Sequence, residues 1–295
     1  MNDPIKIAVL GGDMRQVCAA EWLKHAGCAV KVWGLCASSE EVESASSAED
    51  AAASADVLLL PLPLSRDRLQ VSGTDLSLGG LLSMLRAGTT VFCGLPREEF
   101  ICAAEKQGAE VFDYNRDEIF QLRNAQPTAE GAVAVAMSEM RRTLFGSRVL
   151  VVGYGRIAKL LSDLLIRMGA LVTVAARKET DLTLAAMHGC RCLPLQRKDS
   201  SGEYQLSVGH EQYHVIFNTV PAPVIGGEAL RNLDRNTLLI DLASAPGGID
   251  YDTAAALGLK TVIALSLPGK LAPITAGEII GECVLRHLRE RGRGI

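Results

Sequence analysis

Three small residues in the middle of the chain, Gly153, Gly155 and Ala158, have the spacing G-x-G-x-x-A of a pyrophosphate-binding turn. They follow an apolar, strand-like run and open a helical pattern. The first glycine permits a tight turn, the second lets the backbone approach a phosphate, and the small third residue lets the helix lie close to the strand. The helix N-terminus, which begins with Arg156 and Ile157, would then face the phosphates. This pattern predicts a dinucleotide site, and the alternative is a purely structural strand–helix turn.

The end of the next apolar run favours NADP over NAD. An NAD site usually carries a carboxylate about 20 residues after the glycines, where it accepts a hydrogen bond from the ribose 2′-hydroxyl. Here the run ends at Ala176, Arg177 and Lys178 follow, and the first carboxylate is Glu179 in the next helical stretch. Two cations suit a 2′-phosphate, which an acid would repel. The alternative is that Arg177 and Lys178 are only a solvated strand end.

A second turn, Gly11-Gly12-Asp13, follows the first apolar run but lacks the dinucleotide spacing. Asp13 would place a negative charge where a pyrophosphate lies, so we expect no second nucleotide there. Ligands of α/β sheets bind at the carboxyl ends of the strands. Gly12, Asp13 and Arg15 are therefore predicted to face a substrate, with Arg15 binding a carboxylate bidentately. The alternatives are that Asp13 caps the first helix and that Arg15 lies on its surface.

The stretch His210–His214, HEQYH, matches a zinc-protease signature, but its surroundings do not support zinc. Zinc binding needs both histidines on one continuous helix and a third ligand downstream. Gly209 precedes the motif and the strand-like run VIFNTVP follows it directly. Eight cysteines lack C-x-x-C spacing, and Cys190 and Cys192 form a C-x-C, which is a weak metal signal. We therefore predict no metal site and interpret most cysteines as reduced core residues.

Short apolar runs alternate with helical patterns, which predicts parallel sheets covered by helices. A length of 295 residues is typical of two domains. The predicted strands are 5–10, 29–33, 57–60, 90–93 and 110–112 in a first series, and 148–152, 172–175, 215–219, 238–242 and 260–264 in a second. A helix over 127–147, with Pro127 at its start, would connect the two series. An amphipathic helix over 275–289 would return to the first domain.

The predicted fold is α/β, with two Rossmann-like, doubly wound, mainly parallel domains around a cleft, joined by crossing helices. Residues 1–125 with 275–295 would form a flavodoxin-like or Rossmann-like substrate domain, and 126–274 the NADP-binding domain with its connecting helix. The net charge of −4 and the lack of a long basic run argue against nucleic acid. The apolar run before Gly11 is too short for a signal peptide or a membrane span. We expect a cytoplasmic protein.

Six segments at the expected strand ends and helix starts together resemble the family of the dipicolinate synthase A subunit. They are GGDMRQ (11–16), PTAEG (127–131), GYGRIA (153–158), FNTVPAPV (217–224), DLASAPGG (241–248) and LPGKLAPITAGEII (267–280). The first and the last two are the specific ones, and Ala158 stands where the family often has a third glycine.

The resemblance implies an NADP-dependent oxidoreductase that acts on CH–CH bonds. Its substrate would be a cyclic dicarboxylate, dihydrodipicolinate or its 4-hydroxy-tetrahydro precursor, and its product dipicolinate. It also implies a flavoprotein-like B subunit for a partner, a homo-oligomer, and a place in the cytoplasm of the mother cell during sporulation.

The candidate site residues lie on the turns of these segments. Two substrate carboxylates need cations, hydroxyls or amides, and the candidates are Gly12, Arg15, Thr128, Ser244, Lys270 and Thr275. A base must accept a proton from the ring, and Asp13, Glu130 and Lys270 stay open for this role. Asn218, Thr219 and Val220 follow a predicted strand where the nicotinamide would lie.

Two other functions stay open. The first is another two-lobed NAD(P)-dependent dehydrogenase of the 2-hydroxyacid or alanine dehydrogenase type. Such enzymes usually place a histidine beside the nicotinamide, whereas no histidine follows the fourth strand of the second series until His287. The second is a non-catalytic NADP-binding subunit whose partner performs the chemistry.

Overall fold

The computed structural model of the chain describes residues 3–36, 40–198, 203–209 and 211–292. The chain divides into two compact units, residues 1–124 with 268–295 and residues 125–267. The chain therefore returns to the first unit at Pro268 rather than at 275. Each unit contains one six-stranded sheet.

The sheet of the first unit is parallel throughout and has the strand order β3-β2-β1-β4-β5-β6. Its strands are β1 (Lys6–Leu10), β2 (Ala29–Trp33), β3 (Glu43–Ser44), β4 (Val57–Leu59), β5 (Thr90–Cys93) and β6 (Glu110–Asp113). This is the doubly wound Rossmann order, which reverses between β1 and β4. Ligand sites of such sheets lie at the carboxyl ends of the strands beside that reversal.

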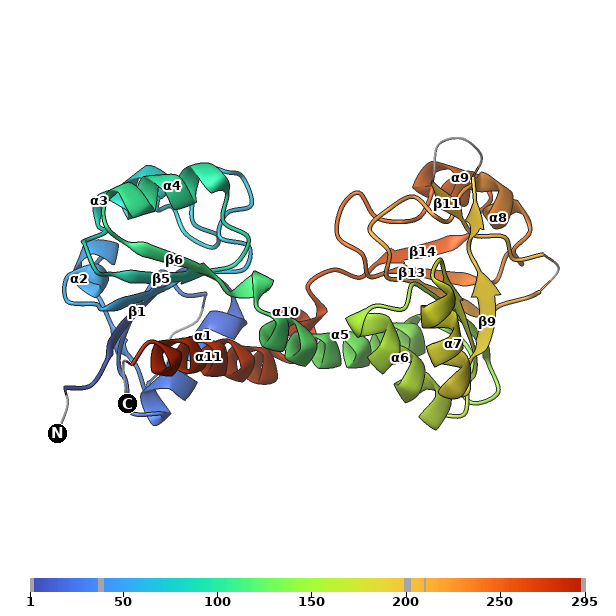
Figure 1. Cartoon of the computed structure of the whole chain (residues 1–295), viewed down its shortest axis with the longest axis horizontal. Coiled ribbons are helices and arrows are strands. Elements are labelled where there is room, and N and C mark those ends of the chain that lie inside the picture. The colour runs from blue at the N-terminus through green and yellow to red at the C-terminus, as the bar shows by residue number, and fades with distance from the viewer. Residues whose placement is uncertain (1–2, 37–39, 199–202, 210, 293–295) are drawn as a thin grey trace. The chain divides into compact units, whose positions relative to one another are not determined.

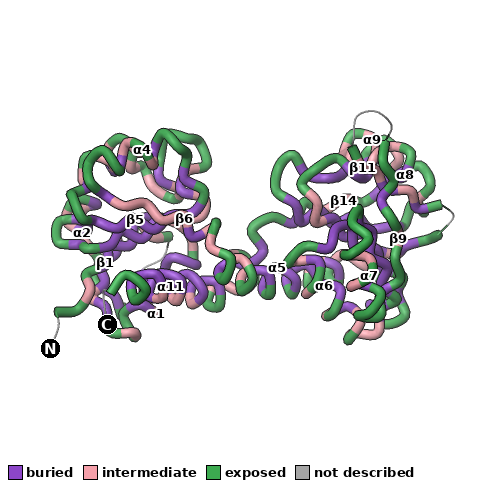
Figure 2. The backbone as a smooth tube through the Cα atoms, in the orientation of Figure 1, coloured by how far each residue is buried: buried purple, intermediate pink, exposed green. Residues whose placement is uncertain are grey.

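Both faces of this sheet are covered, which explains why its central strands are continuous apolar runs (Figures 1 and 2). Ile7 and Val9 of β1 face α1 (Met14–His25) and α11 (Pro273–Glu290). Ala8 and Leu10 face the other layer. That layer is formed by α2 (Ala48–Ala52), α3 (Leu78–Ser83) and α4 (Glu98–Lys106).

Two glycines on α11 allow it to lie directly against α1. A Cβ added to Gly277 would lie 2.8 Å from the carbonyl oxygen of Arg15, and one added to Gly281 would lie 2.5 Å from Cε3 of Trp22. The contacts progress in the same direction along both helices, so α1 and α11 run parallel. Their N-termini are therefore neighbours at the carboxyl edge of the sheet.

The sheet of the second unit repeats the same parallel topology, with the order β14-β13-β12-β7-β8-β9. Its strands are β7 (Arg148–Val152), β8 (Leu171–Ala176), β9 (Arg191–Pro194), β12 (Val215–Asn218), β13 (Leu238–Asp241) and β14 (Lys260–Ile263). Its helices include α6 (Arg156–Arg167), α7 (Glu179–Met187), α8 (Gly227–Arg231) and α9 (Tyr251–Ala256). A short hairpin of β10 (Gln196–Arg197) and β11 (Tyr204–Gln205) follows β9. The protein thus contains two Rossmann-like sheets, as the sequence predicts.

The predicted connecting helix is wrong at both ends. Helix α5 runs from Glu118 to Glu139, so Pro127 lies inside it rather than at its start. Asp117 begins the helix by accepting a hydrogen bond from the amide of Phe120 at 2.7 Å. Proline removes one helical hydrogen bond, but α5 continues because its alanines are buried on both sides of the proline, at 125, 129, 132 and 136. Among the described residues, no helix has the length and apolar character needed to cross a bilayer.

Candidate functional site

The turn between β7 and α6 has the backbone geometry that the G-x-G-x-x-A pattern predicts. Gly153 has a φ of +99°, and an added Cβ would overlap Oγ1 of Thr219 and lie 3.0 Å from Cγ2 of Val220. Only glycine fits this position without displacing the loop after β12. Ala158 is fully buried on the inner face of α6, where a larger side chain would push the helix from the sheet.

The N-terminus of α6 has no side chain of its own as a cap. Gly155 is the N-cap residue, and no carboxylate lies in the first turn. Among the described residues other than its two chain neighbours, none has an atom within 4 Å of a Cβ added to Gly155. Arg156 is exposed and Ile157 is half-buried in this turn. The first amides of a helix need external partners, and their partial positive charge favours an anion. The open space beside Gly155 therefore fits a pyrophosphate.

The carboxyl end of β8 has the residues expected for a phosphorylated ribose. Ala176 is buried, whereas Arg177 and Lys178 are exposed and form no ion pair within the described part of the chain. Lys178 is the N-cap residue of α7, and the first carboxylate, Glu179, lies in the first helical turn. Two cations therefore stand at the strand end itself, and the two acids of the first turn of α7, Glu179 and Asp181, follow them.

Thr219 and Val220 lie in the loop after β12, at the reversal of strand order between β7 and β12. Thr219 is half-buried and donates from Oγ1 to the carbonyl of Val152 at 2.9 Å, which ties this loop to the end of β7. Asn218 was predicted to contact the cofactor, but it is fully buried, so its side chain is not accessible to a ligand. Its Nδ2 donates to Asp241 at 2.8 Å and to the carbonyl of Val220 at 3.0 Å. Asn218 therefore shapes the loop from beneath.

Asp241, the last residue of β13, organises the two neighbouring loops and was missed by sequence reasoning. It is fully buried and accepts hydrogen bonds from the amides of Ala243 and Gly248, both at 2.9 Å, and from the hydroxyl of Tyr251 at 2.6 Å. Burial and the bond to Asp241 raise the pKa of Tyr251 to about 12. The available signal was a carboxylate that ends a fully apolar strand, LLID. Such an acid must be hydrogen-bonded.

Ser244 is the one predicted substrate residue on this network. It is exposed on the loop after β13, and its carbonyl accepts from the amide of Gly247 at 2.9 Å. Thr128 and Glu130 lie on α5 in the same unit. Glu130 is exposed and accepts a hydrogen bond from Nε2 of Gln126 at 2.7 Å.

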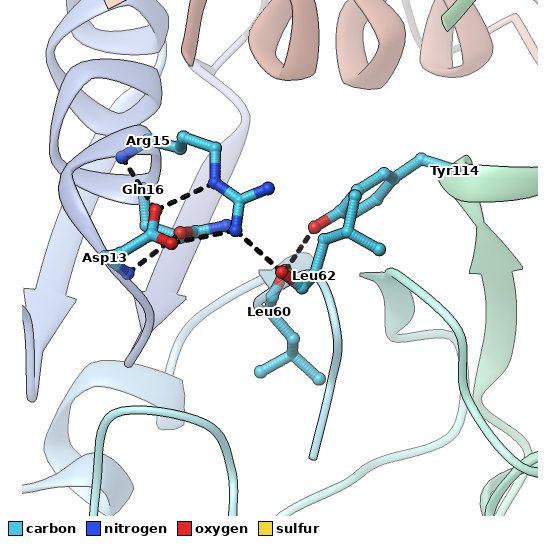
Figure 3. Close-up of polar contacts among 6 residues, drawn as sticks. All are labelled: Asp13, Arg15, Gln16, Leu60, Leu62 and Tyr114. Atoms are coloured by element: carbon cyan, nitrogen blue, oxygen red, sulfur yellow. Dashed lines mark hydrogen bonds and ion pairs between the residues drawn. The ribbon is translucent and has the colours of Figure 1, made fainter. Parts of the chain in front are cut away.

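In the first unit, Asp13 and Arg15 form a bidentate ion pair (Figure 3). Nε and Nη2 of Arg15 each donate to one carboxylate oxygen of Asp13 at 2.8 Å, and Nη2 also donates to the carbonyl of Leu62 at 2.7 Å. Asp13 is the N-cap of α1 and forms a capping box with Gln16. Only 7% of the Arg15 side chain is exposed. The pair therefore joins the start of α1 to the loop after β4.

This arrangement does not suit Asp13 as a proton acceptor. Burial alone would raise the pKa of Asp13, but the hydrogen bonds and charge of Arg15 outweigh it and hold the pKa below its usual value. The same pair raises the pKa of Arg15 despite its burial. The alternative role, a helix cap, is the one that the structure shows for Asp13. Arg15 is likewise committed to partners within the protein rather than standing free for a carboxylate.

Lys270 and Thr275 lie close to this pair in the first unit. Lys270 is exposed on the short helix α10 (Leu267–Leu271). A Cβ on its neighbour Gly269 would lie 2.9 Å from Nε of Arg15. Thr275 is exposed in the first turn of α11, which has neither a side-chain cap nor an acidic residue. The two residues therefore accompany a second helix N-terminus without a side-chain cap, whose partial positive charge favours an anion.

The loop after β4 adds a cation that sequence reasoning missed. Arg66 is exposed and lies near enough to Asp13 to help lower the pKa of that carboxyl. Gly12, with a φ of +106°, donates its amide to the carbonyl of Ser72 at 2.8 Å and so packs against the same loop. The loop could have been found because SRDR (65–68) ends the apolar stretch VLLLPLPL (57–64), which contains the strand at the reversal beside β1.

The structure gives no support to metal binding in the part that it describes. His210 lies outside the described residues, and residues 211–214 form no helix before β12. Among the described residues, no group of three His, Cys, Asp or Glu side chains could hold a metal ion.

Two Rossmann-like units in one chain, one of them with an uncapped G-x-G-x-x-A turn, form a fold that is also found in solved structures of dehydrogenases. The solved structure of an L-alanine dehydrogenase shares this fold, with a TM-score of 0.61 over 96% of this chain and 90% of that chain, at 13% identity.

A family model for the N-terminal domain of the dipicolinate synthase A subunit matches residues 6–115. The A subunit of dipicolinate synthase from Bacillus subtilis (strain 168) is 30% identical over 207 residues, which span 69% of this chain and 66%, just under two thirds, of that relative. The solved structure of the dipicolinate synthase A chain from Bacillus subtilis has a TM-score of 0.81 and 26% identity over 98% of this chain and 97% of that chain. The chain belongs to the family of the dipicolinate synthase A subunit.

Proposed function

We propose that the protein is an NADP-dependent oxidoreductase that forms dipicolinate from a dihydrodipicolinate or its hydroxylated tetrahydro precursor. It would be the A subunit of a dipicolinate synthase and work beside a B subunit. The observation that carries the proposal is the uncapped helix N-terminus at Gly155, followed by a strand end with two cations and no acid. The family of the chain supplies the substrate class.

The second unit would bind the cofactor. The amides that follow Gly155 would hold the pyrophosphate, and Arg177 with Lys178 would hold the ribose phosphate. The loop of Thr219 and Val220, fixed by its bond to the end of β7, would orient the nicotinamide. Bound NADP⁺ supplies a hydride acceptor.

The first unit would bind the dicarboxylate. Lys270, Thr275 and the first amides of α11 offer a cation, a hydroxyl and a helix N-terminus to one carboxylate. Arg15 would position this site through its pair with Asp13. Oxidation removes a hydride and a proton from the ring, and from the hydroxylated precursor a water as well. Both carboxylate oxygens of Asp13 are occupied by Arg15 and its pKa is lowered, so Asp13 would be a weak base. Glu130 and Lys270 stay as candidates for the proton acceptor, Lys270 only in its neutral form and then not as the cation of the carboxylate site.

The test is turnover by the purified chain. The chain would be mixed with NADP⁺ and freshly made precursor, with and without a B subunit, while NADPH absorbance and dipicolinate are followed. We expect both products in equal amounts and a lower rate with NAD⁺. Arg177→Asp should weaken binding of NADP⁺ far more than that of NAD⁺.

The outcomes separate the remaining functions. Turnover by the single chain would rule out a non-catalytic subunit. A variant of this chain with a disabled NADP⁺ site would be tested together with the B subunit. If that mixture still formed dipicolinate, the hydride step would belong to the partner and the proposal would be overturned. No dipicolinate under either condition, with oxidation of a 2-hydroxy acid or an amino acid instead, would overturn it in favour of another dehydrogenase.

A further inference from the structure

A further basic segment, Arg197 and Lys198, follows strand β9, which lies beside β8 and thus beside the proposed site of the ribose phosphate. Strand β9 pairs with β8 in parallel, with Ala176 opposite Pro194. The amide of Leu195 then donates to the carbonyl of Ala176 at 2.9 Å. The chain that leaves β9 therefore starts directly beside the step from Ala176 to Arg177.

The hairpin that follows holds this segment in place. Gln196 and Arg197 form β10 and pair with Gln205 and Tyr204 of β11. Buried leucines anchor both sides of the hairpin, Leu195 on one and Leu206 on the other. The amide of Leu206 also donates to the carbonyl of Val224 at 2.7 Å. Arg197 is therefore presented from a fixed backbone rather than from a long loop.

Arg197 is available for a ligand. It is exposed and has no ion-pair partner in the described part of the chain, whereas the next residue, Lys198, lies 4.0 Å from Glu203. Arg197 is two residues beyond Leu195, which is about 7 Å along an extended chain. Two arginine side chains from these neighbouring segments can reach one phosphate group between them. Guanidinium groups bind phosphate oxygens with paired hydrogen bonds.

We propose that Arg197 is a specificity-determining residue that binds, together with Arg177, the phosphate monoester on the ribose of the dinucleotide. The inference rests on the proposed function, because it concerns the same nucleotide site. According to this inference, selection of NADP over NAD depends on the segment after β9 as well as on the end of β8. A nucleotide without the 2′-phosphate would gain nothing from Arg197.

Binding measurements on single variants test the proposal. Dissociation constants for NADP⁺ and NAD⁺ would be measured by titration calorimetry for the full chain and for Arg197→Ala, Arg197→Lys and Arg177→Ala. Arg235→Ala is the matched control, because Arg235 is exposed in the turn before β13, away from the carboxyl ends of the strands. Adenosine 2′,5′-bisphosphate and AMP would serve as probes that lack the nicotinamide.

We expect Arg197→Ala to weaken binding of NADP⁺ and of the bisphosphate by about tenfold to a hundredfold, the usual size of a hydrogen bond to a charged group. Binding of NAD⁺ and AMP should stay within about twofold of the unmodified protein. Arg197→Lys should keep part of the affinity because it keeps the charge. Arg235→Ala should change the affinity for neither nucleotide.

The outcomes distinguish this inference from the proposed function. If the unmodified chain binds NAD⁺ as tightly as NADP⁺, the proposed use of NADP itself is wrong. If it prefers NADP⁺ and Arg177→Ala removes the preference while Arg197→Ala behaves like Arg235→Ala, only the role of Arg197 is overturned. An equal loss for both nucleotides on Arg197→Ala would also overturn it, since the hairpin would then act through its shape.

Discussion

Replacing Asp241 by asparagine should destabilise the carboxyl edge of the second sheet, although the two side chains have the same shape. Asp241 is fully buried, and each of its oxygens accepts two hydrogen bonds. One oxygen receives Nδ2 of Asn218 and the amide of Ala243. The other receives the amide of Gly248 and the hydroxyl of Tyr251.

The size of the effect follows from these four bonds. Asparagine keeps one oxygen, and its NH₂ group can turn toward Tyr251, whose hydroxyl can reverse and accept a hydrogen bond. The amide of Gly248 then has lost its acceptor. A buried donor without a partner costs about 1–3 kcal/mol, so Asp241→Asn should lower the free energy of unfolding by about 1–3 kcal/mol. A domain is stable by about 5–15 kcal/mol, so this loss is measurable.

Urea unfolding followed by circular dichroism would measure this loss, and hydrogen exchange over residues 241–251 would locate it. Asp234→Asn is the matched control, since Asp234 is exposed and accepts hydrogen bonds only from the backbone amide and Nδ2 of Asn236 among the described contacts. It should change stability by less than about 1 kcal/mol. An effect of Asp241→Asn as small as that of the control would refute the account of Asp241 as the centre of this edge.

Two further predictions concern the packing of α11 in the first unit. Burial, and then the charge of Arg291, lower the pKa of His287, which stacks on Phe112 with ring centres 3.9 Å apart. The unfolded chain therefore binds the proton first, and stability falls as the pH drops below about 6.5. His287→Phe should reduce this loss in unfolding experiments from about pH 7 to about pH 5, and an unchanged pH dependence would contradict the assignment. Gly281→Ala should lower stability by about 1–2 kcal/mol, because overlap with Trp22 outweighs the gain in helix propensity. A raised melting temperature would contradict the close packing of α1 and α11.

Most strands could be predicted because they are short apolar runs between polar turns. Thr90–Cys93 and Arg148–Val152 have the predicted bounds and are almost wholly buried on both faces. Ala29–Trp33 also has the predicted bounds, although its buried residues alternate with half-buried ones. The hairpin of β10 and β11 could not be predicted in this way. Its strands have two residues each and no apolar alternation, so its pairing depends on anchors that lie apart in the sequence.

The bounds of α5 and the ion-pair partner of Arg15 could not be predicted from the sequence, for different reasons. Local preference places a helix start at Pro127, but buried alanines on both sides carry the helix through it. Arg15 was expected to hold a substrate, and its spacing from Asp13 allows that as readily as an ion pair. The ion pair prevails because the carbonyl of Leu62, 47 positions further along the chain, completes it.

The nature of each helix start distinguishes the two sheets, which share one topology. After β1, Asp13 caps α1 with its own carboxylate, and a Cβ on Gly12 would lie 2.5 Å from Oε1 of Gln16. The positive end of that helix is already neutralised and its turn is filled. After β7, Gly155 leaves the start of α6 without a cap and the space beside it open. An anion would have to displace a carboxylate in the first turn but only water in the second. The turns after β1 and β7 are therefore equivalent in topology but not in charge. With Asp13 as the cap residue the first turn does not suit a nucleotide phosphate, whereas with Gly155 as the cap residue the second turn does.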